Sequence, residues 1–206
     1  MSDDSKAAHL AAVPSEEDLL RARLYRLLAA LLANIPDRAA LDSVAGLFGD
    51  SSSDLGRAIG ALAEAAASAD AAAVDNEFHD LFVGVGRGEL MPYGSYYLTG
   101  FVYEKPLARL RGDMAALGIA RAEGVKEPED HIASLCEMMA GLIEGDFGEP
   151  ADLATQRNFF DSHLGPWVGQ FFADLESAKK SSFYKAVGNV GRVFAEIEST
   201  AFEMAA

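Results

Sequence analysis

The stretch SEEDLLRARLYRLLAALLANIP, residues 15–36, decides the fold class of this chain. Ser15 is followed three positions later by Asp18, which is the spacing of a capping box at the start of a helix. Apolar residues then recur every three or four positions, as on one face of a helix; they are Leu20, Leu24, Leu27, Leu28, Leu31 and Ile35. Pro36 ends the run. The stretch therefore predicts one amphipathic helix.

The rest of the chain repeats this helical period and shows no strand-like alternation of useful length. Further helices are expected to begin near Asp37, Leu55, Asp70, Ser95, Pro128, Pro150, Pro166 and Ser181. The helix after Ser95 is expected to include Phe101 and Val102, and Pro106 either kinks it or begins a new one. Residues 84–93, which are rich in glycine, are expected to form a mobile loop.

Length and composition favour one domain. The chain has 206 residues, half of them hydrophobic, and this is enough for one good core. Alanine, leucine and glutamate are abundant, which is typical of helical proteins. We expect an all-α fold: a single-domain helical bundle in residues 15–206, preceded by a flexible tail in residues 1–14.

The formal net charge of −15 restricts the partners of this protein. Such a surface repels nucleic-acid phosphates and attracts basic ligands, such as a peptide that carries arginines. The simpler alternative is that the acidity only keeps the protein soluble.

The compartment is predicted from what the sequence lacks. Cys136 is the single cysteine, so no intramolecular disulfide can form, as is usual in a reducing compartment. The first residues carry no apolar run like a signal-peptide core, and charges interrupt every apolar segment before it could span a membrane. We expect a soluble, cytoplasmic protein without stable membrane insertion.

Common enzyme signatures are missing from the sequence. Residues 84–88, GVGRG, match neither a dinucleotide fingerprint nor a phosphate loop, and Gly94-Ser95 lacks the second glycine of a nucleophile elbow. No Glu-x-x-His pair of a di-iron bundle occurs, and the four histidines are scattered along the chain. We expect no catalytic site, metal or cofactor.

Two short motifs carry the functional signal. One is LFVG at residues 81–84, which leads through the glycine-rich stretch to PYGS at residues 92–95, and the other is EPEDH at residues 127–131. Further matching positions, in order, are Glu77-Phe78, Arg111, Gly118, Phe159, His163-Leu164, Pro166-Trp167 and Phe183-Tyr184. In their order and spacing these residues resemble the TorD/DmsD family, cytoplasmic chaperones for the maturation of bacterial molybdoenzymes.

The resemblance implies a fold, a function and a site. The fold is an all-helical bundle of the TorD type. The function is to bind the twin-arginine signal peptide of a molybdoenzyme precursor and to hold it until cofactor insertion and export. The implied peptide-binding residues are Phe78, Leu81, Phe82, Pro92, Tyr93, Gly94, Ser95, Asp130 and His131, with Tyr25 as a further candidate. The resemblance leaves open the client, nucleotide binding and a homodimer.

Physical reasoning gives alternatives for these residues. The Asp130 carboxylate could bind an arginine of the client's signal peptide. Phe78, Phe82 and Tyr93 could line a groove for the apolar segment of the same peptide. Both residues could equally be structural: Asp130 could cap the start of a helix, and His131 could make a hydrogen bond to the nearby loop. A small enzyme that uses both as an acid/base pair is a third hypothesis, although neighbouring helical side chains diverge by about 100°. A helical adaptor without a groove is the fourth.

Overall fold

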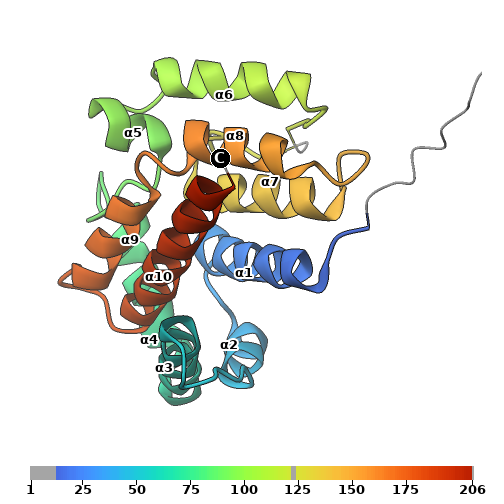
Figure 1. Ribbon diagram of the computed structural model, residues 1–206. Coiled ribbons are helices and arrows are strands. Elements are labelled where there is room, and N and C mark those ends of the chain that lie inside the picture. Colours follow the sequence, from blue (N-terminus) through green and yellow to red (C-terminus); the bar gives the residue numbers. More distant parts are fainter. Residues whose placement is uncertain (1–12, 122–123, 206) are drawn as a thin grey trace, which may run out of the picture.

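The computed structural model describes residues 13–121 and 124–205, and within these ranges the regular elements are helices (Figure 1). They are α1 (Glu16–Ala33), α2 (Arg38–Ala45), α3 (Asp54–Ser68), α4 (Ala71–Phe78), the π-helix η1 (His79–Val83), α5 (Gly94–Thr99), α6 (Lys105–Ala116), α7 (Ile132–Glu144), α8 (Leu153–His163), α9 (Val168–Ser177) and α10 (Phe183–Met204). The all-α prediction is confirmed. Residues 1–12 of the expected tail lie outside the described ranges.

The helices pack around α7 and α10. α1 runs beside α7 in the middle of the molecule, and α10 lies against α9 and α3 (Figure 1). α5 and α6 form one end of the bundle, and α2 and α3 form the other (Figure 1). In the described part of the chain, no helix is both long enough and apolar enough to cross a bilayer.

The first helix begins as its sequence predicts. The Ser15 hydroxyl accepts a hydrogen bond from the Asp18 N–H at 3.1 Å, and the Asp18 carboxylate accepts one from the Ser15 N–H at 3.2 Å. Two N–H groups at the helix start are thereby satisfied.

Two predicted helix boundaries are wrong. α5 ends at Thr99, because Gly100 takes a left-handed conformation with φ +85°, so Phe101 and Val102 lie outside it. Pro106 then sits in the first turn of a new helix, α6. Pro128 lies before α7 rather than in its first turn, because His131 has an extended backbone and is the N-terminal cap, so that the helix begins at Ile132.

The end of α4 holds a feature that the periodicity does not predict. The chain continues from Phe78 into one π-helical turn, in which the Gly84 N–H donates to the His79 carbonyl at 2.7 Å. Such turns are rare and often mark functional sites. Residues 84–93 follow without a helix, as expected. Gly84 has φ +62°, and a Cβ there would meet the Arg87 carbonyl, so this turn requires glycine.

Candidate peptide-binding groove

α7 is buried on almost every side, and the exceptions locate a groove. Ten of the 13 residues of α7 are buried, and Glu144 is partly exposed at the end of the helix. The other two exceptions are Ser134 and Glu137. They lie three positions apart, on one face of the helix. Both line a hollow of about 600 Å³ between α7, the end of α1, the α4–η1 junction and the segments around residues 92 and 125.

Two phenylalanines form the aromatic wall of this groove. Phe78 and Phe82 meet edge to face with their ring centroids 5.1 Å apart, and both line the groove. Behind them lies the fully buried Tyr184, with centroids 5.9 Å from Phe78 and 5.4 Å from Phe82. The Tyr184 hydroxyl donates to the Leu31 carbonyl of α1 at 3.0 Å. The wall is therefore fixed from behind and only half-buried at its front.

The PYGS and EPEDH motifs form one structural unit. The Ile132 N–H donates to the Pro92 carbonyl at 2.8 Å, and the Gly94 N–H donates to the Asp130 carbonyl at 2.9 Å. These bonds make an antiparallel bridge between Tyr93 and His131, whose ring centroids lie 5.2 Å apart. Pro92, Tyr93 and His131 thus line the same groove as the aromatic wall.

Asp130 is turned away from the groove. Its side chain is 3% exposed, and Oδ2 accepts a hydrogen bond from the Ser95 N–H of α5 at 2.7 Å. This is the role of a helix cap, which satisfies an N–H group in the first turn. Among the described residues, the Asp130 Oδ1 and the Ser95 hydroxyl have no hydrogen-bond partner.

Other predicted site residues also support the groove from behind. Leu81 and Ser95 are fully buried, and Gly94 lies so close to Trp167 that a Cβ would stand 3.1 Å from the indole nitrogen. Tyr25 is buried as well, and its hydroxyl donates to Glu198 at 2.8 Å. In this conformation, these residues hold the walls in place and do not line the groove.

His131 combines a structural bond with a place in the groove. Its Nδ1 accepts a hydrogen bond from the Ala133 N–H at 3.1 Å, so the ring proton of the neutral form lies on Nε2. Burial lowers the pKa of His131 to about 4 and keeps the ring uncharged at neutral pH. Because Asp130 bonds to α5 and His131 to α7, the two side chains are engaged separately, which does not support an acid/base pair.

Two carboxylates that sequence reasoning did not select as site residues also line the groove. Glu127 and Glu137 both line it. Glu127 accepts a hydrogen bond from the Tyr93 hydroxyl, and burial together with this bond raises the pKa of Tyr93. Glu137 pairs with Arg26 of α1. The available signal for Glu137 was one charged residue in the middle of an otherwise apolar helical run.

Comparison with known proteins identifies the family. The family model described as "Nitrate reductase delta subunit" matches residues 49–173, which include the aromatic wall and both motifs. The chain belongs to this family. The resemblance to TorD-type chaperones is thereby confirmed.

Curated relatives of this chain are named as chaperones. It is 28% identical over 131 residues to "Chaperone protein TorD" of Vibrio atlanticus, a match that covers 60% of this chain and 61% of the relative. It is 27% identical over 134 residues to the protein of the same name from a Psychrobacter species, with 62% and 61% covered. The matches thus span about three fifths of these relatives. Their names agree with the expectation that this protein is not an enzyme.

A solved structure shares the fold. A protein from Archaeoglobus fulgidus, described as a redox enzyme maturation protein, superposes with a TM-score of 0.56. The superposition covers 92% of this chain and 99% of the other at 23% identity. This likeness shows that both chains have the same helical architecture.

Proposed function

We propose that this protein is a maturation chaperone that binds the twin-arginine signal peptide of a molybdoenzyme precursor. It holds the peptide until the cofactor has been inserted and the precursor is ready for export. In this proposal the encounter takes place in the cytoplasm, before export. Membership of the TorD-like family supports the role, and the groove supports the ligand.

The observation that carries the proposal is the combination of surfaces in the groove. Phe78 and Phe82 offer aromatic faces to apolar side chains, while Glu127 and Glu137 offer carboxylates to guanidinium groups within the same hollow. Arginine suits carboxylates because its planar fork donates two parallel hydrogen bonds. A signal peptide with a basic end and an apolar segment matches both surfaces.

Within this proposal, the arginine-binding role moves from Asp130 to the two glutamates. The Asp130 carboxylate is buried and bonded to α5, whereas Glu127 and Glu137 are exposed. The net charge of −15 adds a long-range attraction for a basic peptide, and this attraction raises the association rate most at low salt.

The test is calorimetric titration with three synthetic peptides: the twin-arginine signal peptide, the same peptide with both arginines replaced by alanine, and the same peptide with its apolar segment replaced by serines. We expect both replacements to weaken binding about tenfold or more. Replacing the arginines removes hydrogen bonds between charged groups, which contribute about 1.5–3 kcal/mol each, and replacing the apolar segment removes the burial of apolar surface. Glu137→Gln should weaken binding of the intact peptide, whereas Glu64→Gln on the exposed face of α3 should not. Equal affinity for all three peptides would overturn the proposal.

A further inference from the structure

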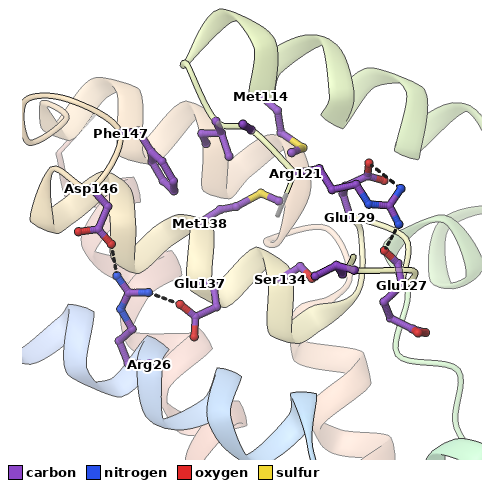
Figure 2. Close-up of a pocket in the computed structure, with 13 residues that line it drawn as sticks. Arg26, Met114, Arg121, Glu127, Glu129, Ser134, Glu137, Met138, Asp146 and Phe147 are labelled. Atoms are coloured by element: carbon purple, nitrogen blue, oxygen red, sulfur yellow. Dashed lines mark hydrogen bonds and ion pairs between the residues drawn. The ribbon is translucent and has the colours of Figure 1, made fainter. Parts of the chain in front are cut away.

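A second hollow of about 310 Å³ adjoins the groove (Figure 2). It lies between the end of α6, the segment that follows it, α7 and the turn after α7. Its apolar lining comes from Met114, Ile119, Val125, Met138 and Phe147. Figure 2 shows Met114, Met138 and Phe147 around one space. Methionine side chains are flexible and polarisable, and such surfaces adapt to apolar ligands of varied shape.

The two hollows share a wall. Val125, Glu127, Ser134 and Glu137 line both of them. Ser134 and Glu137 are the strip of α7 that reaches solvent between buried neighbours. A peptide that binds its arginines at this wall therefore has apolar surface on either side of them.

Ion pairs border the Met-lined hollow on two sides. Arg26 is held by Glu137 and Asp146, and Arg121 lies 3.5 Å from Glu129 (Figure 2). Arg26 also pairs with Glu144 at 2.9 Å. The lining contains four carboxylates, those of Glu127, Glu129, Glu137 and Asp146, but only two guanidinium groups. The border therefore keeps a negative charge that complements a basic peptide.

Phe147 takes its position because α7 has a glycine beneath it. A Cβ at Gly141 would stand 2.6 Å from the Phe147 ring. The turn that carries Phe147 is tied to α7 by the Asp146 N–H, which donates to the Gly141 carbonyl at 2.9 Å. The outer edge of the ring thus rests against the helix at Gly141, and Phe147 forms one side of the hollow.

The size of the ligand favours a second binding place. The apolar core of a signal peptide has roughly 7–15 residues, which span about 10–23 Å as a helix and more when extended. Such a segment has more apolar surface than Phe78 and Phe82 cover. The adjoining hollow has a mostly apolar lining, shares a wall with the groove and is bordered by carboxylates.

We propose that the Met-lined hollow is a second subsite, which receives apolar side chains of the client's signal peptide while its arginines bind at the shared wall. This inference rests on the proposed function and specifies where the apolar segment binds. A second copy of this chain as the occupant is an outcome that the test separates.

The methionines provide the probe. We would label the methyl groups of all methionines with carbon-13 and titrate the protein with the twin-arginine peptide. The Met114 and Met138 signals should shift, whereas Met139, fully buried beside Met138 in the sequence, should stay in place as an internal control. The peptide whose apolar segment is replaced by serines should leave all three signals unchanged. Shifts that depend on protein concentration without peptide would identify a second copy as the occupant and overturn the inference.

A blocking variant gives an independent measurement. Ala120 is exposed and lines the hollow, whereas Ala115 is exposed and lies outside both hollows. Ala120→Trp should lower the affinity for the intact peptide about tenfold and leave the affinity for the serine-replaced peptide unchanged. Ala115→Trp should change neither affinity. If the intact peptide binds but neither the methyl signals nor Ala120→Trp respond, the subsite is wrong and the proposed function stands. If no peptide binds, both fail.

Discussion

Asp130 and His131 are neighbours in the sequence, but each serves a different helix. The Asp130 carboxylate bonds to the Ser95 N–H of α5, and the His131 ring bonds to the Ala133 N–H of α7. The sequence located both residues in a significant motif and left the role of each open. Their orientation could not be predicted, because it follows from pairing with residues 92–94, more than thirty positions earlier.

The cap predicts a loss of stability at Asp130. Asp130→Ala leaves the buried Ser95 N–H without its acceptor, and we expect the free energy of unfolding to fall by about 1–3 kcal/mol. Urea denaturation measures this change. Asp70 is a suitable control, because it precedes α4 but makes no side-chain cap bond; Asp70→Ala should stay within about 0.5 kcal/mol of wild type. Wild-type stability combined with lost peptide binding in Asp130→Ala would instead make Asp130 a client contact.

At the scale of elements, one helix is capped by another. α10 begins at Phe183 without a side-chain cap from its own N-terminal residue, Ser182. Instead, the Glu77 carboxylate of α4 accepts hydrogen bonds from the N–H groups of Ser182 at 2.8 Å, Phe183 at 3.1 Å and Tyr184 at 2.7 Å. Sequence rules look for a cap within three residues, so they could not predict this role for Glu77, which the family resemblance gave only as a matching position.

The shared cap predicts coupled effects of changes at Glu77. Glu77→Ala removes the acceptor for these N–H groups, and we expect it to lower the free energy of unfolding by about 2–3 kcal/mol, with Glu77→Gln between Ala and wild type. Because Phe78, which forms part of the aromatic wall, directly follows Glu77, Glu77→Ala should also lower the affinity for the intact signal peptide, as measured by calorimetry. Glu64→Ala on the surface of α3 is the matched control. A variant with unchanged unfolding would contradict the assignment of the cap.

At the scale of the whole molecule, a buried ion pair joins the first helix to the last. Glu198 of α10 is 1% exposed and accepts from Arg21 of α1 at 2.7 and 2.9 Å and from the Tyr25 hydroxyl at 2.8 Å. The fold class was predictable, because the long helices carry their own periodicity. The packing of α1 on α10 was not, because residues 177 positions apart leave no local pattern.

We expect removal of one partner of this ion pair to cost more stability than replacement of both partners by apolar residues. Glu198→Ala leaves Arg21 with Asp18, at 2.9 Å, as its remaining carboxylate partner and leaves the buried Tyr25 hydroxyl without its acceptor, and we expect a cost of about 3 kcal/mol. The double variant Arg21→Met with Glu198→Leu should regain much of that loss, because apolar packing replaces a buried pair well. Thermal or urea unfolding of the single and double variants measures both effects, and Glu203→Ala on the exposed side of α10 is the control. If the losses of Arg21→Met and Glu198→Leu, measured singly, add up to the loss of the double variant, the coupling is refuted.

For the proposed Met-lined subsite, Gly141 has a consequence for how clients are distinguished in evolution. Phe147 lies on α7 only where residue 141 has no Cβ. A relative with alanine or a larger residue at that position must place this aromatic ring elsewhere, and the apolar side chains that fit beside it change accordingly. Under this proposal, preference for a client can diverge through a position that touches no client. A comparison of relatives that scores only contact residues would overlook it.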